Sequence, residues 1–252
     1  SEDLFVATKV GRNNYPGPYS PKTLREHIEA GRARLGVEAV DLVQLHCIPT
    51  EVMADGEIFE WLRDLKQSGI IKNFGASVES MEEALLVLDQ PGLTSLQIIF
   101  NVFRQKPISA LFDAAKEKGV GIVVRLPLAS GLLSGKFTNA STFDETDHRN
   151  YNRDGACFNV GETFAGLPFS QGVELADRVK SIVPAELNMA EFAQRWILDH
   201  DAVSTVITGA TRPEQVLSNI AASSMKPLSE ELHQQLETLY QNEVHAHIRG
   251  PY

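Results

Sequence analysis

Polar side chains stand at or just past the ends of four short apolar segments and within a fifth, and each segment has the length of a buried β-strand. They are Lys9, His46, Ser77, Gln97 and Arg125. Lysine and histidine take part in proton transfer, whereas serine, glutamine and arginine hold polar ligands. Because parallel strands end at one rim of a barrel, we expect these groups to gather there. Taken singly, each has a second explanation as a solvated or backbone-bonded strand end.

A second candidate site follows the last predicted strand, where Gly209, Thr211 and Arg212 precede a helix that starts near Pro213. The first turn of a helix presents free N–H groups and the positive end of its dipole, so it attracts anions. An arginine beside it would strengthen phosphate binding. The alternative is that Thr211 is merely the N-cap of this helix.

Two common nucleotide motifs are missing from the sequence. No GxGxxG follows any predicted strand, so a Rossmann site has no support. The stretch Gly131–Phe137 (GLLSGKF) is one residue too short for a P-loop, and Phe137 stands where a magnesium-binding Ser or Thr is needed. A nucleotide would therefore have to bind in another way.

The elements that position these residues alternate between strands and helices. The predicted strands are Leu4–Thr8, Val40–Leu45, Ile70–Ala76, Ser95–Phe100, Val120–Leu126 and Ala202–Thr208. The predicted helices are Lys22–Leu35, Glu57–Gln67, Ser80–Leu88, Ile108–Lys118, Val173–Val183, Ala190–Leu198, Pro213–Ala221 and Ser229–Gln241. This alternation favours a (β/α) barrel or a doubly wound sheet in a single domain over residues 1–252. In residues 137–172 the apolar residues follow neither the helical nor the strand period, and the aromatic content of this segment favours a folded lid.

Composition narrows the classes of partner. The 252 residues are 43% hydrophobic and 22% charged, with a net charge of −10, which argues against nucleic acid and against an anionic membrane. No apolar run has the length of a membrane span. Cys47 and Cys157 lie far apart and form no metal-binding spacing, so we expect reduced thiols and a cytoplasmic protein. Oligomeric state is left open.

Five segments together resemble the aldo-keto reductase family along essentially the whole chain. They are Ala7–Gly11 (ATKVG), Val40–Pro49 (VDLVQLHCIP), Gly69–Ser80 (GIIKNFGASVES), Leu126–Lys136 (LPLASGLLSGK) and Gly209–Asn219 (GATRPEQVLSN). The resemblance implies a TIM (β/α)8-type barrel, here with about six of the eight βα units, extra helices and a long loop. It also implies an NADPH-dependent reductase of small-molecule aldehydes or ketones that binds NADP(H) without a Rossmann fold.

The same resemblance assigns residue roles. Lys9 and His46 would be catalytic: a tyrosine protonates the carbonyl oxygen, the lysine lowers the pKa of that tyrosine, and the histidine orients the carbonyl. Ser77 and Gln97 would hold the nicotinamide carboxamide. The segment from Arg125, Leu126, Pro127 and Leu128 to Lys136 would wrap the nicotinamide and pyrophosphate. Gly209, Thr211, Gln215 and Asn219 would grip the adenosine phosphate end, with Arg212 beside the 2′-phosphate.

Three departures from the family pattern stand out. Val78 replaces the usual Asn or Arg, and Arg125-Leu126 replaces an aromatic residue and Ser, which would place a guanidinium against the nicotinamide. The family's DTAxxYG segment, which carries the catalytic Tyr and Asp, precedes the lysine strand and has no counterpart here. About 60 residues, or two βα units, would be missing. Tyr15 and Tyr19 are weak substitutes, since a loop tyrosine has no fixed position relative to Lys9.

We therefore expect these residues by themselves to be inactive or nearly so. One alternative is a non-catalytic NADP(H)-binding or regulatory subunit of the same fold, with which Val78 and Arg125 agree. Another is a fragment that completes its barrel through a partner chain, because open strand edges are unfavourable in a monomer. Arg149, Tyr151 and Arg153 of the long loop would either fold over a ligand or remain solvated.

Overall fold

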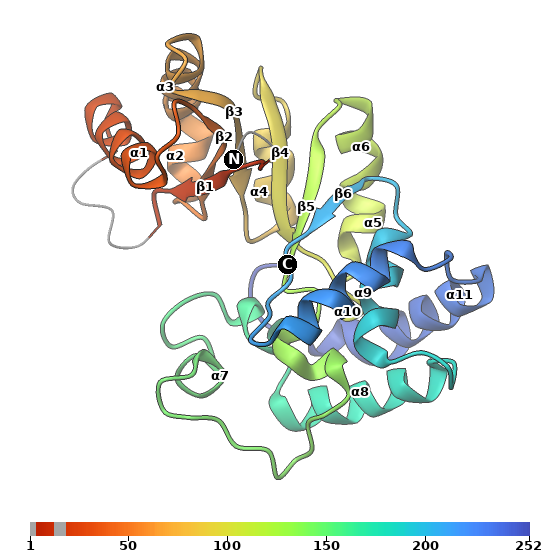
Figure 1. The fold of residues 1–252 in the computed structure, drawn as a ribbon. Coiled ribbons are helices and arrows are strands. Elements are labelled where there is room, and N and C mark those ends of the chain that lie inside the picture. Colours follow the sequence, from red (N-terminus) through yellow and green to blue (C-terminus); the bar gives the residue numbers. More distant parts are fainter. Residues whose placement is uncertain (1–3, 13–18) are drawn as a thin grey trace. The chain divides into compact units, whose positions relative to one another are not determined.

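The structure, a computed structural model, describes residues 4–12 and 19–252 and separates into two compact units (Figure 1). Unit 1 comprises the chain up to Ile98 together with Leu111–Ile122, and unit 2 comprises Ile99–Ala110 and Val123–Tyr252. Each unit is described by itself below. The single-domain organisation over residues 1–252 stays a prediction.

The strands follow one another in chain order, β1-β2-β3-β4-β5-β6. Their bounds are β1 Ala7–Val10, β2 Val40–His46, β3 Ile71–Ser77, β4 Leu93–Ile99, β5 Gly121–Arg125 and β6 Val203–Val206. In unit 1, β1 to β4 are paired in parallel, as the apolar strands predicted. In unit 2, the Ile207 N–H donates to the carbonyl of Val124, at a distance of 2.8 Å, where β6 runs beside β5.

The first and last predicted strands differ from the observed ones. The ladder of β1 starts at Ala7, paired with Leu42, and not at Leu4. Just before it, the Val6 N–H donates to the side chain of Asp41 at 2.8 Å, so a carboxylate sets where pairing begins. Leu4 and Phe5 lie outside the strand and remain exposed. In β6 the two central residues, Ser204 and Thr205, are also exposed, so this strand is not buried on both faces.

The helices of unit 1 follow its strands (Figure 1). They are α1 Pro21–Leu35, α2 Thr50–Asp55, α3 Glu57–Gln67, α4 Met81–Leu88 and α6 Phe112–Glu117. Ser20 caps α1 and accepts a hydrogen bond from the N–H of Thr23, while Gly36 ends the helix in a left-handed conformation with φ 67°. Helix α3 has its predicted bounds, and its buried stripe includes Ile58, Leu62 and Leu65.

The predicted helix Ile108–Lys118 is wrong as a single element. It is broken at Leu111, whose φ of −133° lies outside the helical region. Residues before the break form α5, Lys106–Ala110, which belongs to unit 2, and those after it form α6 in unit 1. The apolar period continues across the break, so it does not reveal that the two halves pack in different cores.

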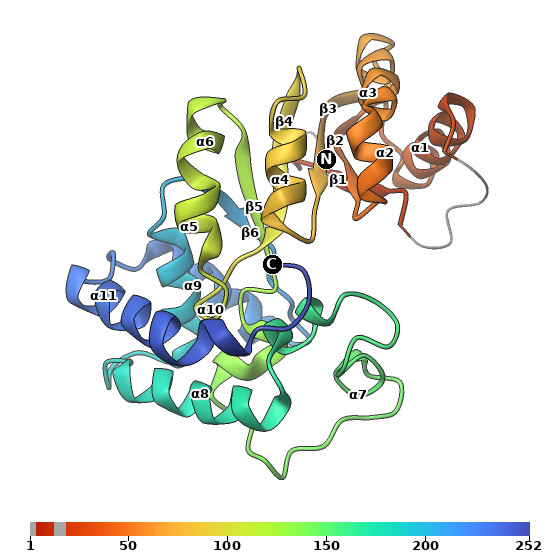
Figure 2. The same cartoon turned by 180° about the vertical axis from the view of Figure 1, so that it is seen from behind.

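Unit 2 is mainly helical and gathers α8 to α11 (Figure 2). Its elements after β5 are η1 Ala129–Ser134, α7 His148–Tyr151, η2 Val160–Glu162, η3 Phe164–Gly166, α8 Phe169–Ile182, α9 Met189–Leu198, α10 Pro213–Ser224, α11 Glu230–Leu239, η4 Tyr240–Val244 and η5 His245–His247. Buried Phe192 and Trp196 place α9 in the core of this unit. Within the described residues, every helix is too short or too polar to cross a membrane.

Residues 137–172 contain more regular structure than their sequence predicted. Besides α7, η2 and η3, helix α8 already begins at Phe169, four positions before Val173. Its first residue packs on Phe164 with a ring separation of 4.9 Å and on Phe143 with 5.5 Å. Phe143 and Phe169 are too far apart in the chain for their contact to appear as a periodic pattern in the sequence.

The arginines of this segment lie against its own aromatic rings. The guanidinium of Arg149 stands 4.6 Å from the ring centre of Phe143 and binds Asp147. Those hydrogen bonds from Arg149 lower the pKa of the Asp147 carboxyl to about 2. Arg153 stands 5.2 Å from the ring centre of Phe169. Tyr151 is exposed. Both arginines thus stabilise the segment itself through cation–π contacts.

One side chain organises the middle of this segment. Asn152 is fully buried, and its Oδ1 accepts hydrogen bonds of 2.9 Å from the backbone N–H groups of Cys157 and Phe158. Its Nδ2 donates to Oγ1 of Thr163, also buried, at 3.0 Å. Every hydrogen-bonding position of the Asn152 carbonyl is therefore used to close a turn.

The chain's last residues are anchored inside unit 2. Arg104, which is 1% exposed, donates through Nη2 to the carbonyl of Pro251 at 2.7 Å and stacks on the ring of Tyr252. The backbone N–H of Lys106 donates to the hydroxyl of Tyr252 at 2.9 Å. That hydroxyl also shares a hydrogen bond of 2.6 Å with Tyr240. Burial of Tyr252 raises the pKa of its hydroxyl.

A histidine beside Trp196 is expected to make the stability of unit 2 depend on pH. Burial, together with the charge of His233, lowers the pKa of His200 to about 4. An unfolded histidine titrates near 6.5, so between these two values the unfolded chain binds a proton that the folded chain does not. Stability is therefore complete above about pH 6.5 and falls as the pH drops towards about 4, by up to about 3 kcal/mol.

Urea unfolding at pH 7 and pH 5 measures this loss. His200→Asn should flatten the dependence, whereas the same change at exposed His247 should leave it as in the wild type. An equal loss of stability in His200→Asn would mean that another group causes it.

Candidate active site and cofactor site

The strand ends of unit 1 bring four of the predicted site residues onto one face. Register pairs His46 with Ser77, and Ser77 with Gln97, across β2, β3 and β4. Lys9, in β1, is paired with Gln44, which stands two positions before His46 on the same face of β2. Lys9 is exposed and His46 half-buried, whereas Ser77 and Gln97 are 1% and 3% exposed. Ser77 is the last residue of β3, not the first one after it.

Two buried polar residues beneath this rim were not singled out from the sequence. Gln44 accepts a hydrogen bond of 2.8 Å on Oε1 from Nε2 of Gln97, and donates through its own Nε2 to Oγ of Ser95 at 3.2 Å. All three side chains are less than 9% exposed. A buried amide that makes its hydrogen bonds is held in one orientation, so Gln44 fixes the rotamer of Gln97.

An arginine also contacts the predicted catalytic histidine. Nη1 of Arg12 lies 3.3 Å from Nε2 of His46. Because a guanidinium only donates hydrogen bonds, Nε2 is the acceptor here, and a neutral imidazole would carry its proton on Nδ1. Tyr19, a possible substitute proton donor, donates its hydroxyl to the carbonyl of Gly11 at 2.6 Å. Tyr15 lies outside the described residues.

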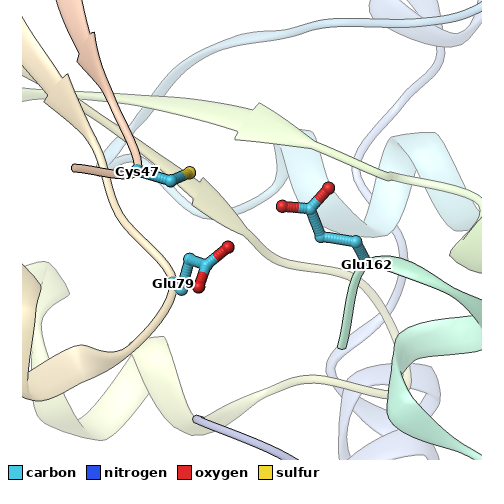
Figure 3. A group of neighbouring side chains, drawn as sticks. All are labelled: Cys47, Glu79 and Glu162. Atoms are coloured by element: carbon cyan, nitrogen blue, oxygen red, sulfur yellow. The ribbon is translucent and has the colours of Figure 1, made fainter. Parts of the chain in front are cut away.

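The turns that follow β2 and β3 complete this end of unit 1 (Figure 3). Cys47 comes directly after β2 with a left-handed φ of 49°, and its N–H donates to the carbonyl of Ser77 at 2.9 Å. After β3, Val78 is fully buried and its N–H donates to the carbonyl of Gln97 at 3.0 Å. The Val78 side chain thus belongs to the core and offers no polar contact. Glu79 then leads into α4.

In unit 2, the segment after β5 has an unusual backbone. Leu126, Ala129 and Ser130 are left-handed, with φ values of 57°, 48° and 57°. Such values are uncommon for residues other than glycine and often occur where a backbone is shaped for a ligand. Pro127 is buried, Leu126 and Leu128 are half-buried, and Lys136 is exposed. The carbonyl of Leu126 is held by Nδ2 of Asn101 at 2.9 Å.

The start of α10 is exposed and has a donor set that suits phosphate. Its N-cap is Arg212, not Thr211. Oε1 of Gln215 accepts hydrogen bonds from the N–H groups of Thr211 and Arg212, at 2.6 and 3.2 Å. The side chains of Thr211 and Arg212 are exposed, and Arg212 makes no ion pair with any residue in the described ranges. The Thr211 hydroxyl also donates to Oε1 of Gln215, at 3.1 Å, so the exposed Arg212 guanidinium is the group that remains available to an anion.

Asn219, a residue expected to bind the adenosine end, is engaged in supporting contacts. Its Oδ1 accepts a hydrogen bond of 2.9 Å from Nε2 of buried Gln194 on α9, and its Nδ2 reaches the carbonyl of Gly209 at 3.5 Å. Gly209 has open space around the position of a Cβ. Gln194 was not predicted as a support of this site, because its contact joins two separate helices.

Each unit, taken by itself, has features that would suit one part of a phosphorylated dinucleotide. The left-handed backbone after β5 and the exposed cation at the start of α10 both lie in unit 2. Polar side chains that could hold an amide lie at the strand ends of unit 1.

Comparison with known proteins identifies the family. A model of the aldo/keto reductase family matches residues 1–241, and the chain belongs to this family. It is 30% identical, over 237 residues, to the L-glyceraldehyde 3-phosphate reductase of Escherichia coli (strain K12). That match covers 88% of this chain and 65% of the reductase, so the chain spans about two thirds of its relative's length.

Two solved structures are similar along almost the whole chain. The holo form of aldo-keto reductase AKR11C1 from Bacillus halodurans is 26% identical with a TM-score of 0.72, and covers 94% of this chain and 72% of its own. The glycerol dehydrogenase AKR11B4 from Gluconobacter oxydans is 25% identical with a TM-score of 0.74, covering 95% and 72%. The prediction of an α/β fold of the TIM-barrel type is thereby confirmed.

Proposed function

We propose that this chain carries the lysine, the histidine and the cofactor contacts of an NADPH-dependent oxidoreductase that reduces aldehydes or ketones. The observation that carries the proposal is the register of β1 to β4, which aligns His46, Ser77 and Gln97 on the face that Lys9 shares. Membership of the aldo/keto reductase family supports it. Localisation in the cytoplasm and the type of carbonyl substrate stay predictions.

In unit 1, Lys9 would hold a positive charge beside the group that protonates the carbonyl oxygen and favour its deprotonated form. His46 would orient the carbonyl, and to donate through Nε2 it would have to exchange its present contact with Arg12. Ser77 and Gln97 would hold the carboxamide of the cofactor, Gln97 in the orientation that Gln44 imposes. The cofactor, when bound, supplies the hydride.

In unit 2, Arg125 would stand beside the nicotinamide ring, and Leu126, Pro127, Leu128 and Lys136 would surround the pyrophosphate. Gly209, Thr211, Gln215 and Asn219 would hold the adenosine phosphate end. Arg212 would bind the 2′-phosphate, which only NADP(H) has, because its exposed guanidinium has no competing ion pair among the described residues.

We further propose that the 252 residues by themselves reduce carbonyls weakly or not at all. A second candidate is a non-catalytic NADP(H)-binding subunit. The buried side chain of Val78 favours it, since it removes a polar contact that a family member would offer.

Cofactor binding and turnover test these proposals separately. Titration with NADPH, followed by protein fluorescence, should show binding, and a panel of aldehydes and ketones should show little NADPH oxidation. Absence of binding would overturn the oxidoreductase proposal, and rapid turnover would overturn the proposal of inactivity. In a polypeptide that also carries a DTAxxYG-like segment, binding without turnover would favour the non-catalytic subunit.

Arg212→Leu is expected to weaken NADPH binding about 10- to 100-fold, because it removes charged hydrogen bonds to phosphate. NADH lacks the 2′-phosphate, so its dissociation constant should stay within about twofold. The control is Arg178→Leu, which removes an exposed arginine paired with Glu243. Equal weakening of NADPH and NADH would contradict the assigned role of Arg212.

A further inference from the structure

An ion pair inside unit 2 joins the end of β5 to the long segment that follows. Arg125 is the last residue of β5, and its Nη1 lies 3.4 Å from Oε1 of Glu162, the last residue of η2. Each of the two side chains is only 13% exposed. At such low exposure the two opposite charges compensate each other, so changing one residue alters the electrostatic environment of the other.

The backbone at Glu162 is also held in place by hydrogen bonds. Oγ of Ser130 donates to the carbonyl of Glu162 at 3.2 Å and accepts from the N–H of Phe164 at 3.1 Å. Ser130 and Phe164 are both left-handed, with φ values of 57° and 53°. Backbone in this region costs about 1–2 kcal/mol per residue, and it persists only where the surroundings impose it. The turn that carries Glu162 is thus held against the segment that follows Arg125.

We propose that Glu162 is a positioning residue that holds the Arg125 guanidinium at the nicotinamide ring and offsets its charge, and so sets the preference between oxidised and reduced cofactor. The inference rests on the proposed function, in which Arg125 stands beside that ring. Arg125 stands out in the sequence as a departure from the family pattern, whereas Glu162 lies in a segment without a periodic pattern.

The charge of the cofactor gives the direction of the effect. The oxidised nicotinamide ring carries a positive charge, whereas the reduced ring is neutral. A guanidinium alone would repel the oxidised ring, and the carboxylate of Glu162 counteracts this repulsion. Removal of the carboxylate charge should therefore raise the dissociation constant of NADP⁺ more than that of NADPH.

The test is Glu162→Gln, with both dissociation constants measured by calorimetry on the protein that contains these residues. The ratio of the NADP⁺ constant to the NADPH constant is expected to rise about tenfold. For a two-electron couple, tenfold corresponds to a shift of the bound potential by about +30 mV. Glu162→Asp, which keeps the charge, should restore the ratio to within about threefold of the wild type.

A matched control and a reciprocal variant sharpen the test. Asp154 lies in the same long segment but is exposed and paired with Arg249, so Asp154→Asn should leave the ratio unchanged. Arg125→Gln removes the positive charge and keeps the Glu162 carboxylate, so the ratio should fall below that of the wild type. In the double variant R125Q/E162Q, neither charge remains, and the ratio should return towards the wild-type value.

The outcomes separate this inference from the proposed function. If the wild type binds neither NADP⁺ nor NADPH, the proposed function fails and this inference fails with it. If the wild type binds both but Glu162→Gln keeps the same ratio, this inference alone is overturned. If circular dichroism shows that Glu162→Gln does not fold, Arg125→Gln is compared with R125Q/E162Q instead. Equal ratios of the NADP⁺ to the NADPH dissociation constant in these two variants would overturn this inference.

Discussion

Gly75→Ala is expected to lower the free energy of unfolding of unit 1 by about 3 kcal/mol or more. A Cβ at this position would lie 2.3 Å from Oγ of Ser95 and 2.5 Å from its backbone carbonyl oxygen. The pairing of β3 with β4 is irregular between Phe74 and Gly75, where the two strands approach closely. The added methyl group would push β4 away and disturb Ser95, the hydrogen-bond partner of Gln44.

Urea unfolding followed by circular dichroism measures this effect. Gly31→Ala, in the same unit, is the control, because its Cβ would meet only Nη2 of Arg34, at 3.9 Å, within helix α1. That change should raise stability by about 0.5–1 kcal/mol, since glycine is unfavourable inside a helix. Wild-type stability in Gly75→Ala would show that β4 moves without cost and that the close approach is not needed.

The second large effect is expected from Asn152→Ala, which removes three buried hydrogen bonds in the long segment of unit 2. It leaves the N–H groups of Cys157 and Phe158 and the hydroxyl of Thr163 without their partner. The expected cost is about 3 kcal/mol, which increases local opening about 100-fold. Hydrogen exchange at the amides of Cys157 and Phe158 reports this opening directly.

The control for this prediction lies two residues away in the sequence. Asn150 is exposed, so Asn150→Ala should leave the exchange of these amides as in the wild type. Protection that survives Asn152→Ala would show that the aromatic cluster of Phe143, Phe164 and Phe169 is sufficient to hold the turn.

The regular part of the fold follows from local patterns, and the exceptions follow from side-chain contacts between distant residues. Helix α3 has its predicted bounds because an apolar stripe and a following glycine mark them within one short window. The start of β1 depends instead on the Asp41 carboxylate that takes the N–H of Val6, 35 residues earlier. The break at Leu111 depends on which core each half joins.

Some residues of the candidate site can also be predicted from local sequence patterns, and others cannot. Lys9, His46, Ser77 and Gln97 are predictable because their residue types stand out at the ends of apolar strands. Gln44 stands two residues before the end of its strand, as Gln97 does in β4, and its role depends on this partner 53 residues away. Glu162 lies in a segment without period and meets Arg125 only in the folded chain. The roles of Gln44 and Glu162 cannot be read from the residues next to them in the sequence, because each role depends on a partner that is reached only in the folded chain.

The anchoring of the last residues has a consequence for biosynthesis. The hydrogen bond from Arg104 to the carbonyl of Pro251 spans 147 residues, and Gln105 donates to the carbonyl of Leu236 across 131. In unit 1, by contrast, every residue up to Ile122, including Gln44, Ser95 and Gln97, is present once Ile122 has left the ribosome. Unit 1 is therefore able to fold during translation, whereas the segment of Arg104 and Gln105 must wait until Pro251 has been synthesised. Until then the Arg104 guanidinium has no Pro251 carbonyl to bind, and chaperones have an exposed segment to protect.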